Sequence, residues 1–268
     1  MSFSQYHPFV LMLYFISVIV LAMFTFNPVM LAIALISSVC CYAVLVKGRN
    51  FGREFLIYSL LFLLIALTNP LFVRGGDTVL FHIRELAVTL ESLQHGFAAA
   101  MLLMSVIYWF KCYNEVMTSE KFMYLFGRVI PKTALTLTVA IRFVPSFKRQ
   151  MTKINAAQKT LGLYASDSRT DKLKNGIRVL SAMTTWALEN SVHTAESMNA
   201  RGYELKEKTN FSLFKLTTHD IMMAVFIFAA TAFVMLQASP VMLGILMFMP
   251  LFIEIWENMR WKYLISKI

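Results

Sequence analysis

The sequence predicts an all-α, polytopic membrane protein with about six transmembrane helices and a cytoplasmic pair of long amphipathic helices. Of the 268 residues, 58% are hydrophobic, compared with roughly 45–50% in soluble domains. Uncharged apolar runs long enough to cross a bilayer core of about 30 Å recur at both ends of the chain. The net charge of +10 is concentrated between these runs, where the positive-inside rule explains it better than nucleic-acid binding.

Three spans are expected before residue 70. Residues 9–26 and 29–46 form uncharged runs separated by Asn27-Pro28, and residues 55–67 form a third run that ends before Asn69-Pro70. A cluster of basic residues lies between the second and third spans and indicates the cytoplasmic side. The cluster consists of Lys47, Arg49 and Arg53.

Three further spans complete the predicted topology. Residues 71–81 are expected at the outer face with a turn at Gly75-Gly76, and residues 84–110 return inward to Lys111. Residues 220–238 and 241–253 form the last two spans, separated by Pro240 and followed by more basic residues. Both termini are therefore expected in the cytoplasm.

The expected domains are an N-terminal transmembrane bundle (1–110), a cytoplasmic helical domain (111–215) and a C-terminal transmembrane hairpin (216–268). The middle part holds about two thirds of the 25 lysine and arginine residues, interleaved with apolar residues at helical spacing. One short helix is expected before Pro131. Two long amphipathic helices follow, at about 132–161, with a kink at Pro145, and at 171–203.

The two long helices are expected to pack on each other. Each has a stripe of residues at steps of three and four, which is typical of one helix face. On the first helix the stripe is Val144, Phe147, Met151, Ile154, Gln158 and Leu161; on the second it is Leu173, Ile177, Leu180, Thr184, Ala187, Ser191, Ala195 and Met198.

The second long helix is predicted to end at Ala200-Arg201-Gly202-Tyr203. Gly202 suits the position after a helix end, because a residue without Cβ adopts the left-handed conformation at low cost. Arg201 then has two readings: a cation that complements the helix dipole, or an arginine presented at a helix tip to an acidic groove of a partner.

Motifs for catalysis or nucleotide binding are absent from the sequence. It has no GxxxxGK[ST] phosphate loop, no HExxH and no paired CxxC, and no serine or cysteine lies in a recognisable nucleophile motif. Glu189, His193 and Glu196 have metal-ligand spacing, but on an exposed helix this pattern is more typical of a solvated face. We therefore expect no enzyme activity, no cofactor and no metal site. The three cysteines are expected to be reduced and structural, and no secretory signal is expected.

Several stretches in a fixed order resemble the T component of energy-coupling factor (ECF) transporters, the EcfT/CbiQ family. The resemblance extends over most of the chain, and its motifs are specific in combination. They are Asn69-Pro70-Leu71-Phe72, Gly76-Asp77-Thr78-Val79-Leu80-Phe81, Glu91-Ser92-Leu93 with Gly96, Arg142-Phe143-Val144-Pro145, Ala156-Ala157-Gln158-Lys159, and Ala195-Glu196-Ser197-Met198-Asn199-Ala200-Arg201-Gly202-Tyr203.

The resemblance implies a scaffold in a bacterial or archaeal cell membrane. Such a scaffold joins two cytoplasmic ABC-type ATPases to a membrane-embedded substrate-binding S component for vitamin or transition-metal uptake. Two coupling helices end in Ala-Arg-Gly-type motifs that dock on the ATPases, and here one motif is Ala200, Arg201 and Gly202. The resemblance favours the docking role for Arg201.

The first coupling motif departs from the family pattern. It should follow Lys159, where the chain has Thr160, Leu161 and Gly162, so the glycine is kept and the arginine is missing. Either Leu161 makes an apolar contact, or Lys159 supplies the charge. A third alternative is that Leu161 only packs the helix pair.

Two other function classes are alternatives to the ECF reading. A secondary transporter or channel with a cytoplasmic helical domain is the alternative, but such proteins have ionisable or Gly/Pro-broken sites at mid-membrane. The cores of five of the six predicted spans lack charge. A membrane-embedded enzyme would need a clustered catalytic set. Neighbouring genes for two ATP-binding proteins would favour the ECF reading over both.

Overall fold

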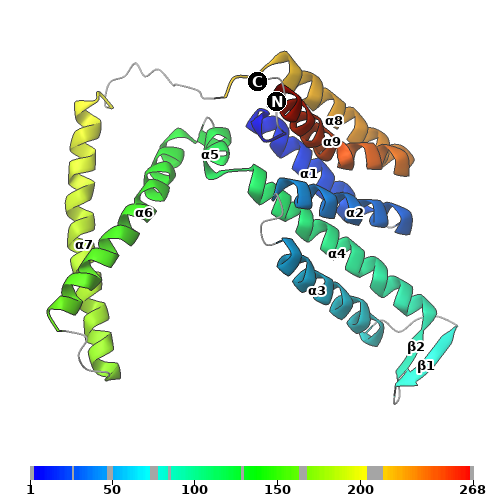
Figure 1. Cartoon of the computed structure of the whole chain (residues 1–268), viewed down its shortest axis with the longest axis horizontal. Coiled ribbons are helices and arrows are strands. Elements are labelled where there is room, and N and C mark those ends of the chain that lie inside the picture. The colour runs from blue at the N-terminus through cyan, green and yellow to red at the C-terminus, as the bar shows by residue number, and fades with distance from the viewer. Residues whose placement is uncertain are drawn as a thin grey trace. The chain divides into compact units, whose positions relative to one another are not determined.

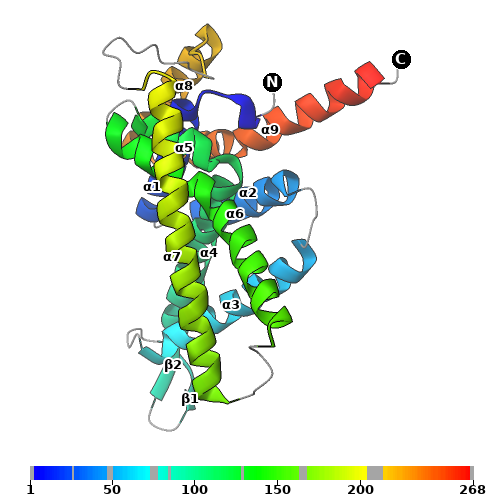
Figure 2. The ribbon, with the colours of Figure 1, turned by 90° about the vertical axis from the view of Figure 1, so that its left-hand side faces the viewer.

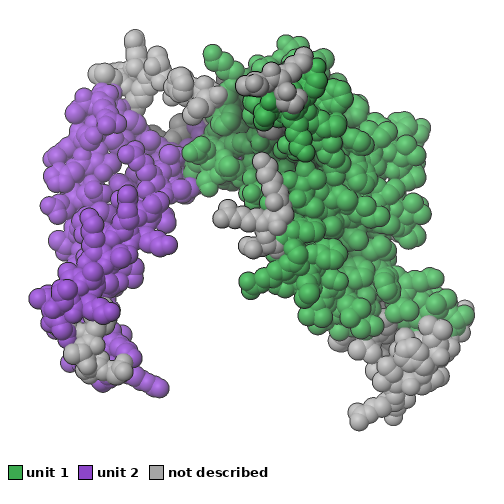
Figure 3. All heavy atoms as spheres, viewed as in Figure 1, with its two compact units in different colours: residues 1–125, 214–268 green, residues 126–213 purple. Residues whose placement is uncertain are grey.

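The computed structural model describes residues 3–25, 27–46, 51–72, 78–83, 86–127, 130–162, 168–203 and 214–265. The chain divides into two compact units (Figure 3). Unit 1 comprises residues 1–125 and 214–268, and unit 2 comprises residues 126–213. The three-part division expected from the sequence stays a prediction.

Unit 1 is a bundle of apolar helices (Figure 1). Among the described residues, five helices are long and apolar enough to cross a membrane, and α1 is a shorter apolar helix of 17 residues. The all-α polytopic fold class is thereby confirmed. The helices of the bundle are α1 (Pro8–Phe24), α2 (Pro28–Leu45), α3 (Phe51–Phe72), α4 (Leu90–Val116), α8 (Thr218–Gln237) and α9 (Pro240–Ile265). In the chain, the short element η1 (Phe3–Gln5) precedes α1, and the short helix α5 (Ser119–Gly127) follows α4.

Proline and a polar cap set the start of the first two apolar helices, α1 and α2. Pro8 and Pro28 occupy the first helical turn, where their missing N–H would have had no intrahelical acceptor. Nδ1 of His7 accepts a hydrogen bond from the Phe9 N–H at 3.3 Å. Oδ1 of Asn27 accepts one from the Val29 N–H at 3.0 Å. The Asn27-Pro28 pair therefore lies between the two apolar helices, as the sequence predicts.

Aromatic side chains of α1 and α4 fill the centre of the bundle. Figure 2 shows the ribbon from a second side. Tyr14, Phe15 and Trp109 are fully buried, and their rings meet edge to face. The Tyr14 hydroxyl donates to the Leu246 carbonyl of α9 at 3.2 Å, so its polar end is satisfied inside the apolar core.

An ion pair joins α3 to α4 beside α2. The Lys111 ammonium pairs with the Glu54 carboxylate, which also accepts a hydrogen bond from the Tyr42 hydroxyl. The same ammonium lies 4.6 Å from the Tyr42 ring centroid and 4.7 Å from that of Tyr58. One cation is thus held by a carboxylate and two ring faces, which ties three helices together.

The predicted start of the fourth span is wrong. Helix α4 begins at Leu90 rather than at residue 84, and a hairpin of β1 (Val79–Ile83) and β2 (Leu86–Thr89) precedes it. Thr89 and Ser92 form a capping box, in which each side chain accepts a hydrogen bond from the other's backbone N–H. This cap fixes the helix start. The predicted turn at Gly75-Gly76 lies outside the described residues, as do Lys47 and Arg49.

Unit 2 consists mainly of two long helices that contact each other, α6 (Pro131–Thr160) and α7 (Arg169–Ala200). They correspond to the two predicted amphipathic helices, and α6 continues through Pro145. The rings of Phe147 and Trp186 meet edge to face where the helices touch, with centroids 5.2 Å apart. Their expected packing on each other is therefore confirmed.

Candidate functional site: two helix tips and a cleft

Helix α7 ends in a hydrogen-bonded glycine cap. Arg201 is the last residue with near-helical dihedrals, and Gly202 has a φ of 78°, in the left-handed region. The Gly202 N–H donates to the Asn199 carbonyl at 2.9 Å, and the Tyr203 N–H donates to the Met198 carbonyl at 3.1 Å. These two bonds define a Schellman motif, which stops the helix and places Arg201 at its tip.

Helix α6 ends in the same way with a different residue at the tip. Leu161 has φ and ψ of −79° and 5°, close to the −84° and 6° of Arg201. Gly162 follows with a φ of 72°, and its N–H donates to the Lys159 carbonyl at 3.1 Å. The chain thus has two tips of matching backbone geometry, one bearing leucine and one bearing arginine.

Leu161 does not pack between the two long helices. Its side chain is 74% exposed, whereas Gln158, one turn earlier, is buried. The alternative that Leu161 only packs the helix pair is therefore wrong, because most of its side chain is exposed. Lys159 and Thr160 are exposed as well. Thr160 Oγ1 donates to the Ala157 carbonyl at 2.7 Å.

Most of the stripe expected on α7 is exposed, although two of its members, Ala187 and Met198, are half-buried. Leu173, Ile177 and Leu180 are 59–67% exposed, whereas Asn175 and Val179 are buried. The packed residues recur at steps of three and four along a neighbouring face: Asp171, Asn175, Val179, Met183, Trp186, Asn190, Thr194 and Met198 are buried or half-buried. Several are polar, which is why a search for apolar periodicity selects the wrong face.

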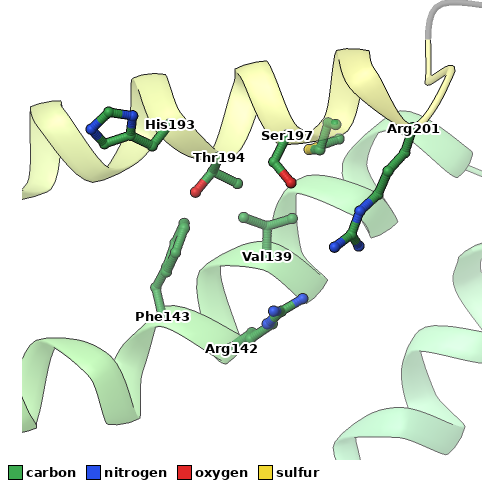
Figure 4. A pocket seen from close by; sticks show the side chains of 8 residues that line it. Val139, Arg142, Phe143, His193, Thr194, Ser197 and Arg201 are labelled. Carbon is green, nitrogen blue, oxygen red and sulfur yellow. The ribbon is translucent and has the colours of Figure 1, made fainter.

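A cleft of about 250 Å³ lies between the two helices near the α7 tip (Figure 4). Its lining combines cationic, hydroxyl and apolar side chains. The lining residues are Val139, Arg142, Phe143, His193, Thr194, Ser197, Met198 and Arg201. In Figure 4, the guanidinium groups of Arg142 and Arg201 extend from different helices into the same space.

The predicted acidic and histidine cluster on α7 lies at one edge of this region. His193 Nδ1 is 3.4 Å from Glu196 Oε2, and both side chains are 69% exposed. Such an exposed pair contributes little to stability. In the described part of the chain, no group of three His, Cys, Asp or Glu side chains could hold a metal ion. The cluster with Glu189 therefore gives no support for a metal site.

Comparison with known proteins assigns the family. Residues 4–213 match the CbiQ family, described as cobalt transport protein. The chain belongs to this family. The resemblance inferred from the motifs is thereby confirmed, and the matched region contains both helix tips and the cleft.

Individual relatives match parts of the chain. The transmembrane protein EcfT of the energy-coupling factor transporter of Listeria innocua serovar 6a is 29% identical over 167 residues, which cover 57% of this chain and 62% of EcfT. The uncharacterised protein MG181 of Mycoplasma genitalium is 32% identical over 98 residues, which cover 36% of this chain and 23% of MG181. Its Mycoplasma pneumoniae homologue is 33% identical over 89 residues, which cover 32% of this chain and 20% of that protein.

Sequence reasoning identified Arg201 but not its neighbour Arg142. Arg142 is part of the Arg142-Phe143-Val144-Pro145 stretch, so its motif was visible in the sequence. Its place beside Arg201 follows from how α6 and α7 cross, and spacing along the chain carries no information about that crossing. The structure brings the two arginines to one cleft and leaves Leu161 at the other tip.

Proposed function

We propose that this membrane transport protein is the coupling subunit of an ECF-type ABC importer. It would join two cytoplasmic ATPases to a membrane-embedded S component and transmit ATPase motion during vitamin or transition-metal uptake. The observation that carries the proposal is the family match, which includes both capped helix tips. Under this proposal, the chain lies in a bacterial or archaeal cell membrane and has both termini in the cytoplasm.

The two helix tips are the proposed docking points. Helices of 30 and 32 residues are about 45 Å long at 1.5 Å per residue, and their backbone hydrogen bonding makes each a stiff lever. In α6 one of these bonds is missing, because Pro145 has no N–H to donate. Arg201 offers a planar fork of donors to carboxylates of one ATPase. At the other tip, Leu161 offers an exposed apolar contact, with Lys159 as the competing source of charge.

Substitutions at both tips test this docking. Arg201→Ala removes a charged hydrogen bond worth about 1.5–3 kcal/mol, and Leu161→Ala removes apolar burial of about 1.5–3 kcal/mol. We expect both variants to weaken ATPase binding and to keep the wild-type melting temperature, since both residues are exposed.

Salt separates the two contacts. At about 1 M salt the Debye length falls to about 3 Å, which weakens exposed charge pairs but not apolar burial. The complex of Arg201→Ala should therefore resist salt better than that of Leu161→Ala. Equal salt dependence would argue against apolar docking at Leu161, and loss of binding in Lys159→Ala would then assign the first contact to Lys159. Wild-type affinity in all three variants would contradict docking through the tips.

The chemical step is assigned to the partners, because the sequence has no phosphate-cradling loop. The purified chain, free of ATPases, should neither bind nor hydrolyse ATP. Hydrolysis that copurifies with the chain through two unrelated chromatographic steps would contradict the scaffold role.

Thiol labelling tests the proposed orientation. Single cysteines at positions 49, 174 and 262 should be shielded from a membrane-impermeant reagent on intact cells, whereas a cysteine at position 75 should react. The background variant replaces Cys40, Cys41 and Cys112. Labelling of position 174 from outside would reverse the assignment of unit 2 to the cytoplasm.

A further inference from the structure

We propose that the cleft between α6 and α7 binds a carboxylate side chain of the docked ATPase, gripped by Arg142 together with Arg201. The inference rests on the proposed function, since the ligand belongs to the ATPase. It adds a second binding residue, from the other helix, to the tip at Arg201. The docking site is thus a two-arginine cleft rather than one exposed side chain.

The cleft brings two positive charges close together. Arg142 and Arg201 both line the cleft (Figure 4). Neither guanidinium has an ion pair or hydrogen bond within the described ranges, and the eight lining residues include no acidic side chain. Cations that approach each other without a counter-charge repel. An anion between them would remove that repulsion and use donors that have no hydrogen-bond acceptor among the described residues.

The donor set suits a carboxylate. A carboxylate accepts hydrogen bonds on two oxygens, and each guanidinium presents several N–H groups in a fixed plane. The Ser197 hydroxyl lines the same cleft. The Thr194 hydroxyl is less available, because it already donates to the Asn190 carbonyl at 2.7 Å. Glu196 does not line the cleft, and its carboxylate lies in an exposed pair with His193.

The size and walls of the cleft favour a side chain over a larger anion. Its volume of about 250 Å³ is below the roughly 300–1,000 Å³ of sites that enclose small-molecule ligands. Val139, Phe143 and Met198 form apolar walls, which suit the methylene stem of an aspartate or glutamate.

Affinity measurements on the complete complex test the cleft. The full chain is purified in phosphatidylcholine nanodiscs and titrated with its ATPase pair at 0.1 M salt. Arg142→Ala should lower the affinity about tenfold to hundredfold, the range of a lost charged hydrogen bond. Arg149, two turns further along α6, is exposed and does not line the cleft. Arg149→Ala is therefore the matched control and should bind within about twofold of wild type.

The double variant shows whether the two arginines share one ligand. If they grip the same carboxylate, the affinity of Arg142→Ala/Arg201→Ala for the ATPases should fall by clearly less than the product of the fold-losses in the two single variants. Arg142→Lys should recover part of the affinity, because it keeps the charge and loses the fork. The melting temperature of Arg142→Ala should equal that of wild type, since the residue is exposed.

Other outcomes overturn the inference in recognisable ways. Wild-type affinity in Arg142→Ala, or losses that multiply in the double variant, would exclude a shared carboxylate. A lowered melting temperature without recovery in Arg142→Lys would make Arg142 structural. An effect seen only in phosphatidylglycerol nanodiscs would assign the cleft to lipid headgroups. Failure of the wild-type chain to bind the ATPases would instead refute the proposed function.

Discussion

Replacement of the cap glycines should loosen the helix tips by a predictable amount. Gly162 has a φ of 72°, and a Cβ added there would meet no atom within 4 Å. The cost of Gly162→Ala is therefore the backbone cost alone, about 1–2 kcal/mol for a residue with Cβ in the left-handed region. Gly202, with a φ of 78°, should respond in the same way.

Gly176 provides the matched control. It lies inside α7, it has no positive φ, and an added Cβ would again meet nothing within 4 Å. Gly176→Ala should therefore stabilise its helix by about 0.8–1.0 kcal/mol, the difference between glycine and alanine in a helix interior. The same substitution thus has opposite signs at two sterically open positions, and the sign depends only on φ.

Amide hydrogen exchange measures the effect locally. In Gly162→Ala, the amides of Leu161 and residue 162, which bond to the carbonyls of Ala157 and Lys159, should exchange about fivefold to thirtyfold faster. Peptides spanning Gly176→Ala should exchange more slowly than in wild type. Unchanged exchange at residue 162, or loss of protection at both sites, would refute the left-handed cap as the cause of the helix end.

Three further perturbations test the packing. Burial lowers the pKa of His7, and the Asp220 carboxylate partly opposes this shift. As the pH falls below about 6.5, His7 therefore becomes protonated in the unfolded chain before it does in the folded chain, which favours unfolding. Acidification in this range should lower the melting temperature, and His7→Gln should reduce that effect. Lys111→Met should lower the melting temperature, because it leaves the Glu54 carboxylate without its ion-pair partner. The further change Glu54→Gln should restore part of the lost melting temperature. Trp186→Ala and Phe147→Leu should show a coupling of about 0.5–1.5 kcal/mol in a double-mutant cycle of thermal unfolding, since the two rings meet edge to face.

Features encoded by adjacent residues could be predicted from the sequence. Apolar helices can be predicted from the sequence because the length of an uncharged run is read directly along the chain. The starts of α1 and α2 follow from a polar cap before Pro8 and Pro28, and the end of α7 follows from Gly202. In each case the decisive residues are neighbours in the chain, so no knowledge of packing is needed.

Features that depend on packing were predicted poorly. The apolar periodicity of α7 selected Leu173, Ile177 and Leu180, which are exposed, while the buried Asn175 lies on the packed face. A polar group can be buried where it finds partners, as Asn175 does in the Arg178 guanidinium, 3.4 Å from its Oδ1. The hairpin of β1 and β2 was not predicted, because residues 71–81 were assigned to a segment at the outer face and residues 84–110 to the fourth span.

The asymmetry between the two tips lies in their side chains rather than in their backbone. Leu161 and Arg201 occupy the same position of matching glycine caps, with φ and ψ differing by only a few degrees. A substitution at one tip can therefore be compared directly with one at the other, because the helix end presents each residue alike. Arg142 enlarges the difference: the α7 tip has a second cation from α6, whereas the tip residue of α6 is a 74% exposed leucine. If both tips dock, one ATPase meets a charged cleft and the other an apolar point, so the two contacts would respond differently to salt.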